Sequence, residues 1–175
     1  MQNNLTVKRI CKNAIMLAML CIIGMFSVPI GENIKVSLQL LIVLIIGLTA
    51  TSVFDSLIIT SLYLVLGLFL PIYAGFHSSI TPTFGYIISF VVISIPLYFI
   101  PKIKAINNTL GMVLASIVSL LICYLIGTIF MMFYLNITLL DTLLISVVPY
   151  IPFDIMKIYL AIVTVKVLNK TMHNE

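Results

Sequence analysis

The sequence predicts an all-α integral membrane protein in which six transmembrane helices form one compact bundle. Of its 175 residues, 62% are hydrophobic and 8% are charged, whereas about a quarter of the residues of a soluble domain are charged. A spanning helix needs about 20 mostly apolar residues, and turn-rich segments divide the chain into stretches of roughly that length. The basic residues gather on one side of those stretches, so we expect both termini in the cytoplasm.

The turn-rich segments set the bounds of the expected helices. We predict helices at about residues 10–28, 36–51, 55–70, 82–100, 109–134 and 152–169. Together they leave no room for a second domain within residues 1–175. Lys8, Arg9 and Lys12 come ahead of an apolar stretch as in a secretory signal, but no small-x-small cleavage site follows, so we expect a retained first span. Asp55 begins the third helix, where its carboxylate can cap the free N–H groups.

Two of the expected helices carry small residues at helical spacing. In helix 109–134 they recur every four residues, at Gly111, Ala115, Ser119, Cys123 and Gly127. Small side chains let helices approach closely in lipid, so we expect this face to cross another helix. In the first helix, Ala14 and Ala18 lie one turn apart. Their face is either an internal helix contact or a docking surface for another membrane protein.

The basic residues give the expected orientation. In the six-helix arrangement, seven lie on the side of the two termini: Lys8, Arg9, Lys12, Lys102, Lys104, Lys166 and Lys170. The opposite side holds only Lys35. By the positive-inside rule, the side that carries the termini is cytoplasmic.

Asp154 and Lys157 are the leading candidates for a functional site, because they form the only charge pair within a long apolar run. An ionisable group in hydrocarbon is expensive unless function requires it. Asp154 lies about 24 Å from Lys170 at 1.5 Å per residue, which places it in the outer half of the membrane. The pair either neutralises itself and clamps the bundle or binds a ligand. In the second case, Lys157 would bind a ligand carboxylate and Asp154 would accept hydrogen bonds from ligand N–H groups.

Other residues of the outer side are candidates to complete a pocket. Gln39 can donate and accept hydrogen bonds, and Tyr86 and Phe76 could supply apolar walls. His77 has no second metal ligand at a suitable spacing, so we expect no metal site. The chain carries no Gly-rich phosphate loop, no GxSxG, no HExxH and no basic run with aromatics. We therefore expect no cofactor, no ATP hydrolysis by this chain and no nucleic-acid partner.

Five sequence elements point to a known family. They are Ala14-x-x-x-Ala18, Val36-Ser-Leu-Gln39, Tyr63-Leu-Val-Leu-Gly67 followed by Leu70-Pro-Ile-Tyr-Ala-Gly75, Pro82-Thr-Phe-Gly-Tyr86, and Pro149-Tyr-Ile-Pro-Phe-Asp-Ile-Met-Lys157. In this order, they resemble the BioY family, the biotin-binding S components of energy-coupling factor (ECF) transporters. The chain departs from the family pattern at Lys35, where proline is usual, at Phe153, where glycine precedes the aspartate, and in its short loop 76–81.

The resemblance implies a multi-pass protein of a bacterial plasma membrane that binds biotin from outside and is not itself an enzyme. With the candidates above, it predicts a biotin site at Asp154, Lys157, Gln39, Gly75, Phe76, Thr83, Tyr86 and Tyr150. It also implies that Ala14 and Ala18 dock on an energy-coupling transmembrane subunit, which works with two cytoplasmic ATPases. An S component for another vitamin, a small membrane enzyme and a structural scaffold are the alternatives.

Overall fold

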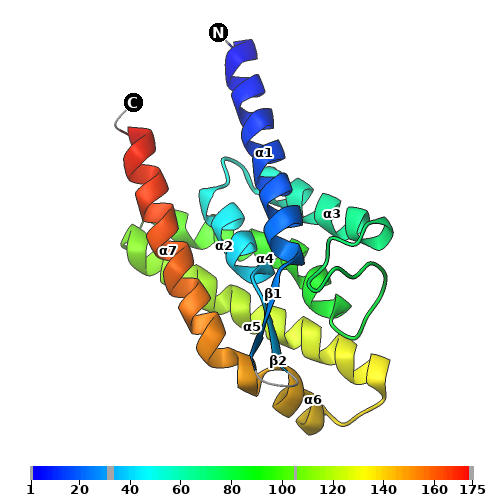
Figure 1. The fold of residues 1–175 in the computed structure, drawn as a ribbon. Coiled ribbons are helices and arrows are strands. Elements are labelled where there is room, and N and C mark those ends of the chain that lie inside the picture. Colours follow the sequence, from blue (N-terminus) through cyan, green and yellow to red (C-terminus); the bar gives the residue numbers. More distant parts are fainter. Residues whose placement is uncertain (1, 31–33, 105, 174–175) are drawn as a thin grey trace.

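The computed structural model describes residues 2–30, 34–104 and 106–173. Its six main helices are α1 (Gln2–Met25), α2 (Gln39–Thr49), α3 (Val53–Phe69), α4 (Phe84–Phe99), α5 (Asn108–Leu135) and α7 (Ile151–His173). The remaining elements are the short helix α6 (Leu139–Ser146), the 3-10 turns η1 (Ile100–Lys102) and η2 (Val148–Tyr150), and the strands β1 (Ser27–Ile30) and β2 (Ile34–Ser37). Figure 1 shows their arrangement. The prediction of a helical fold with six main helices is confirmed.

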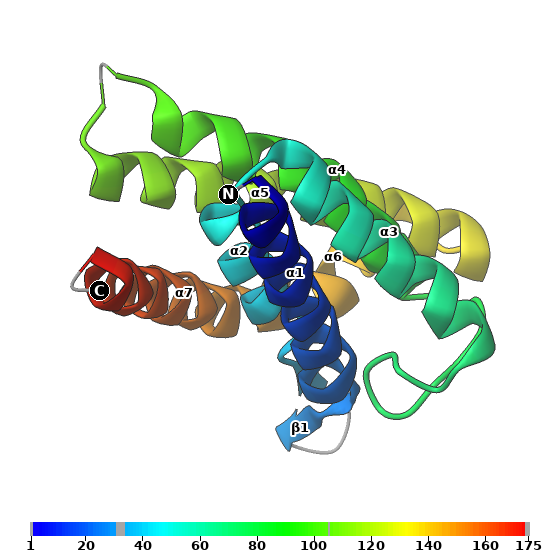
Figure 2. The same ribbon diagram turned by 90° about the horizontal axis from the view of Figure 1, so that it is seen from above.

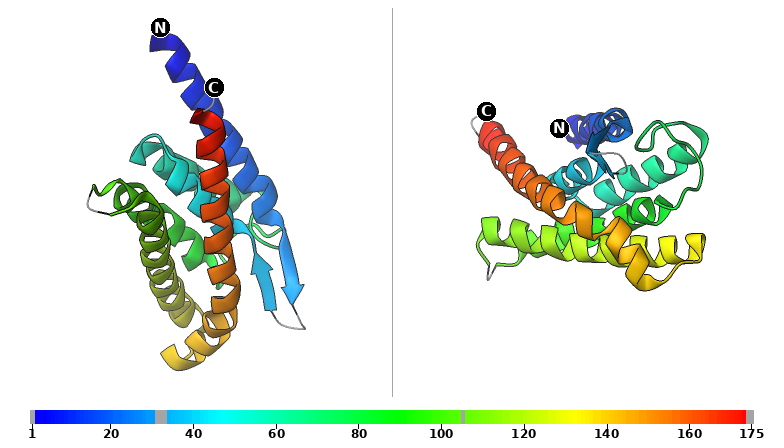
Figure 3. Two further views of the ribbon diagram at one scale, coloured as in Figure 1. Left: turned by 90° about the vertical axis from the view of Figure 1, so that its left-hand side faces the viewer. Right: turned by 60° about the horizontal axis from the view of Figure 1, so that its bottom comes forward.

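The bundle has two distinct ends. Both termini lie at one end, and the β1–β2 hairpin and α6 lie at the other (Figures 1 and 3). α2 is the central helix, because it packs on α1, α3, α4 and α7. Seen from the end that carries the termini, α2 lies between α1 and α7, and α4 and α5 run side by side (Figure 2). Since α2 follows the hairpin directly, its first residue, Gln39, lies toward the hairpin end.

Among the residues that the structure describes, two helical segments are long and apolar enough to cross a membrane on length and composition. They are Phe84–Lys102 and Asn108–Leu135, with mean hydropathies of 2.0 and 2.5. α2 and α3 are shorter apolar helices. Large hydrophobic side chains are exposed on α5 and α7, among them Leu121, Leu125 and Ile155. Such faces suit a lipid environment, because lipid tails are as apolar as leucine.

The chain between α1 and α2 differs from the prediction. The expected helices 10–28 and 36–51 extend into residues that form the two strands, which pair antiparallel with Val28 opposite Val36. Pro29 lacks the N–H that a helix interior requires, and β-branched residues favour an extended backbone. The helical interpretation of these residues was wrong, because a short apolar run of this kind fits either structure.

The N-terminus of α3 is capped as predicted. Ser52 and Asp55 form a capping box, in which Oγ of Ser52 accepts the N–H of Phe54 and the carboxylate of Asp55 accepts the N–H of Ser52. Asp55 is buried, and its two carboxylate oxygens each lie 2.9 Å from Nε of Arg9. Asn13 donates to the same carboxylate at 2.8 Å. A single aspartate therefore caps α3 and also ties α1 to it.

The small-residue face of α5 is a helix crossing, as predicted. All five of its small residues are buried, and α5 packs along α4. A Cβ atom added to Gly111 would lie 2.8 Å from the Cα of Pro101, and one added to Gly127 would lie 2.3 Å from the ring of Tyr86. Real Cβ atoms do not approach other atoms so closely, so both positions need glycine. Gly127 thereby makes room for an aromatic ring.

Candidate ligand-binding site

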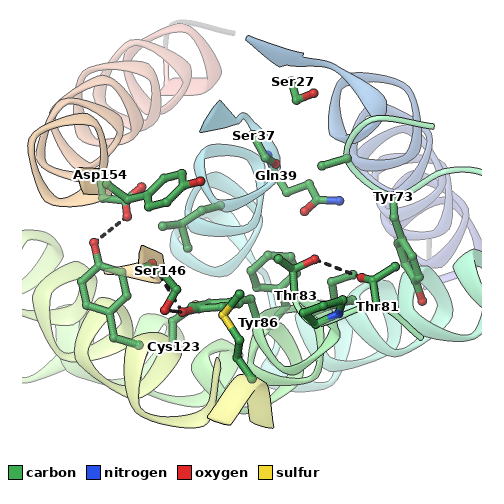
Figure 4. Close-up of a pocket in the computed structure, with 18 of the residues that line it drawn as sticks. Ser27, Ser37, Gln39, Tyr73, Thr81, Thr83, Tyr86, Cys123, Ser146 and Asp154 are labelled. Carbon is green, nitrogen blue, oxygen red and sulfur yellow. Dashed lines mark hydrogen bonds between the residues drawn. The ribbon is translucent and has the colours of Figure 1, made fainter. Parts of the chain in front are cut away.

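A cavity of about 550 Å³ lies at the hairpin end of the bundle, where Ser27 and Ser37 of the two strands line it. Its wall is built from both strands, from α2, α4, α5, α6 and α7, and from the loop between α3 and α4. Asp154 lies on one side of the cavity, Tyr73 and Thr81 lie on the opposite side, and Tyr86 and Cys123 lie between them (Figure 4). Small-molecule sites in proteins occupy about 300–1,000 Å³, so the cavity can enclose a ligand of vitamin size.

Asp154 and Lys157 form the charged part of the cavity wall. They lie one turn apart at the start of α7, and the side chain of each is 6% exposed. Nζ of Lys157 donates to Oδ1 of Asp154 at 2.7 Å, and the hydroxyl of Tyr124, on α5, donates to Oδ2 at 2.6 Å (Figure 4). A buried ion pair is stable only when further hydrogen bonds satisfy its atoms. Tyr124 supplies such a bond, and the pair is at once a contact within α7 and a polar surface of the cavity.

Gln39 is held in the cavity wall at the start of α2. Its Nε2 donates to the hydroxyl of Tyr63, which in turn donates to the carbonyl of Ile72 at 3.0 Å. Tyr63 is fully buried and lies against Gly24 of α1, where an added Cβ would be 2.9 Å from the hydroxyl. Among the described residues, no hydrogen bond uses the amide oxygen of Gln39. That oxygen is a free acceptor for a group in the cavity.

Tyr86 contributes more than the predicted apolar wall. Its hydroxyl donates to Oγ of Ser146 on α6 at 2.8 Å, and that Oγ donates to the carbonyl of Thr142 at 2.8 Å. The ring lies against Gly127 of α5. Tyr86 therefore joins α4 to α6 while one part of its side chain lines the cavity.

The loop before α4 supplies hydroxyl groups on the opposite side of the cavity. Oγ1 of Thr83 lies 3.1 Å from Oγ1 of Thr81, and both residues line the cavity. Tyr73 is buried against Gly67 of α3 and donates to the carbonyl of Leu64 at 2.6 Å. The loop is thus anchored by an aromatic side chain, which holds its threonines beside the start of α4.

Six of the eight predicted ligand residues line this one cavity: Asp154, Lys157, Gln39, Thr83, Tyr86 and Tyr150. Gly75 and Phe76 do not. Gly75 has a positive φ of 81°, and its N–H donates to the carbonyl of Met25. Phe76 also has a positive φ, so the chain turns its side chain outward, where it is 61% exposed and packs edge-on against Phe26. The sequence does not reveal this turn, which keeps Gly75 and Phe76 out of the cavity wall. Their contact with a ligand stays a prediction.

The most important cavity residue that the sequence prediction missed is Tyr124. A phenol in the middle of a 28-residue apolar helix was the available signal. Successive helical residues point about 100° apart, so Tyr124 lies beside the small-residue face of Cys123, and both residues line the cavity. Ser27 and Ser37 were missed because they lie in the strand residues that were predicted as the ends of two helices.

Two further predictions concern Ala14, Ala18 and His77. Both alanines are exposed on α1 and lie outside the cavity, so their face is not an internal contact among the described residues. His77 is exposed and lines the cavity. The part of the chain that the structure describes holds no group of three or more His, Cys, Asp or Glu side chains that could bind a metal ion.

Comparison with known proteins agrees with these features. No curated protein sequence shows a significant match. A crystal structure described as the S-component for biotin from an ECF-type ABC transporter is similar to this chain, with a TM-score of 0.83 and 28% sequence identity. The similarity covers 97% of this chain and 95% of that chain. The sequence profile of the BioY family matches residues 1–174, and the chain therefore belongs to the BioY family.

Proposed function

We propose that this protein binds biotin in the cavity beside Asp154 and Lys157 and is the substrate-binding membrane subunit of an ECF-type transporter. Family membership and the similarity to a biotin S-component support this function. The observation that carries it is the buried ion pair in the wall of a cavity of ligand size. Charges inside a membrane protein are rarely kept unless they serve a substrate or an ion.

The polar groups of the cavity suit a ligand with a carboxylate and with N–H and C=O groups. An ammonium group has three donors, and among the described residues Asp154 uses one donor of Lys157. The other two are available to a ligand carboxylate. Asp154 retains lone pairs that can accept from ligand N–H groups, and Gln39, Thr83 and Tyr150 provide further polar contacts across the cavity.

The proposed orientation places the cavity on the outer side of a bacterial plasma membrane. Both termini lie at the end opposite the hairpin (Figure 1), and seven basic residues belong to the segments that we assign to that side. The positive-inside rule makes this end cytoplasmic. All six main helices would then cross the membrane, with α2 and α3 as the short spans.

The proposed partners bind to α1. Ala14 and Ala18 are exposed, and small side chains permit close helix approach in lipid. We assign this face to an energy-coupling transmembrane subunit, which works with two cytoplasmic ATPases. Those ATPases would supply the energy for transport, and reorientation of the whole chain in the membrane would release biotin inside.

Titration calorimetry with the purified protein tests the proposal. We expect saturable binding of one biotin per chain and no comparable binding of thiamine, riboflavin or other vitamins. Lys157→Ala should abolish binding, whereas Lys166→Ala should leave it unchanged, because Lys166 is exposed on the same helix. A folded protein that binds another vitamin in preference to biotin would contradict the proposal and support a different S component.

A further inference from the structure

We propose that Tyr124 is a positioning residue for the binding of biotin, acting through the carboxylate of Asp154. The inference rests on the proposed function and adds a residue on α5 to a site whose charges both lie on α7. The hydroxyl of Tyr124 donates to Oδ2 of Asp154 at 2.6 Å, while Nζ of Lys157 donates to Oδ1 at 2.7 Å.

The geometry shows why the carboxylate needs a second partner. Asp154 and Lys157 are neighbours on one helix, and their side chains are nearly inaccessible to solvent. A single bond to Lys157 would leave the carboxylate free to rotate about its terminal torsion, which is broad for aspartate. A donor on a different helix fixes both oxygens, so the carboxylate plane has one orientation. Because Nζ of Lys157 donates to Oδ1, the position of the ammonium group is fixed together with the orientation of the carboxylate.

The bond also joins two helices. Within the described part of the chain, it is the one side-chain hydrogen bond between α5 and α7. Tyr124 is half-buried and lines the cavity, so its hydroxyl lies beside the space that we assign to biotin. Loss of the hydroxyl would leave α7 in place through its packing on α2 while the carboxylate loses its fixed orientation.

Tyr124→Phe removes only this hydroxyl. Hydrogen bonds to charged groups contribute more free energy than those between neutral groups. We therefore expect the variant to bind biotin about ten- to a hundredfold more weakly than the wild type. Tyr159→Phe is the matched control, because Tyr159 is exposed on α7. Its affinity for biotin should equal that of the wild type.

A second readout separates positioning from direct contact with biotin. The chain has three aspartates, Asp55, Asp141 and Asp154, so protein labelled with ¹³C at the aspartate carboxyl gives few signals. Asp154→Asn identifies the signal of Asp154. In the biotin-free protein, Tyr124→Phe should shift that signal and leave the other two unchanged, and Tyr159→Phe should shift none.

The combined outcomes decide the proposal. A shifted Asp154 signal together with weaker binding supports it. Weaker binding with an unshifted signal would overturn it, since Tyr124 would then act on biotin itself. A shifted signal with wild-type affinity would also overturn it, since the orientation of the carboxylate would not matter. Failure of the wild type to bind biotin would overturn the proposed function instead, and the carbon signal would still report whether Tyr124 positions Asp154.

Discussion

Replacing Lys157 with methionine removes the ammonium group from the cavity and keeps a side chain of similar length. The carboxylate of Asp154 then stays buried, with the hydroxyl of Tyr124 as its partner among the described residues. Removing one member of a buried ion pair typically lowers the free energy of unfolding by about 3–5 kcal/mol. We therefore expect Lys157→Met to be clearly less stable than the wild type in thermal unfolding in detergent micelles.

The same substitution should weaken biotin binding, because a desolvated charge pair with the ligand carboxylate is lost. Truncating one partner of such a pair costs about 2–5 kcal/mol of binding free energy, which corresponds to about 30-fold to a few thousandfold in affinity. Isothermal titration calorimetry measures this loss directly. Stability and binding therefore fall together in the single variant, and a second variant is needed to separate them.

The double variant Asp154→Asn/Lys157→Met separates the two roles of the pair. The double variant buries no uncompensated charge, because both members of the ion pair are replaced by neutral side chains. The amide oxygen of asparagine still accepts the hydrogen bond of the Tyr124 hydroxyl. We expect stability close to that of the wild type but no recovery of biotin binding. If the double variant regained stability and also bound biotin as tightly as the wild type, the pair would be only a structural clamp and the ligand role of Lys157 would be refuted.

Three further predictions concern other parts of the molecule. Gly127→Ala should weaken biotin binding by about tenfold or more, because the new Cβ would lie 2.3 Å from the ring of Tyr86 and displace that ring into the cavity; calorimetry measures the loss. Tryptophan at Ala14 and Ala18 should prevent co-purification of the energy-coupling subunit and leave biotin affinity unchanged. Asp55→Ala should lower the free energy of unfolding by about 1–3 kcal/mol, because α3 loses its cap and Arg9 and Asn13 of α1 lose their buried acceptor. Thermal unfolding measures this loss, and the affinity for biotin should not change.

Each of these predictions has a matched control. Gly111→Ala meets the backbone of Pro101, remote from the cavity, so it should affect stability and not affinity; equal loss of affinity would show that any glycine substitution in α5 disturbs the site. Val163→Trp, on the exposed face of α7, should still co-purify the coupling subunit, and failure to do so would remove the special role of α1. Asp141→Ala removes an exposed carboxylate that accepts from the hydroxyl of Thr138, the N-cap residue of α6, and should cost less than Asp55→Ala.

The helical fold could be predicted because its main signals are local. Apolar stretches of spanning length, prolines at their ends and the small-residue face of α5 are all readable from the sequence. The hairpin could not be predicted, because its two strands are short, mostly apolar segments that also fit helices. The end of α1 and the start of α2 were misplaced for the same reason.

The candidate site divides in a similar way. Asp154 and Lys157 stand out because charge is rare in this sequence. Gln39 and Tyr86 followed from their expected place on the outer side, and the resemblance added Thr83 and Tyr150; all four line the cavity. Residues on other helices that bond to these side chains cannot be recognised from the sequence. The bond from Tyr124 to Asp154 joins residues 30 positions apart, and no spacing rule within one helix predicts it. The outward turn at Gly75 and Phe76 likewise depends on backbone angles that residue type alone does not fix.

The central claim is that biotin is the ligand of the cavity and that Lys157 is needed to hold it. Mass spectrometry of the small molecules released from protein that was purified from biotin-supplied cells tests this most directly. We expect close to one biotin per chain from the wild type and none from Lys157→Met purified in parallel. Release of a different vitamin from the wild type, or equal amounts of biotin from both proteins, would contradict the claim.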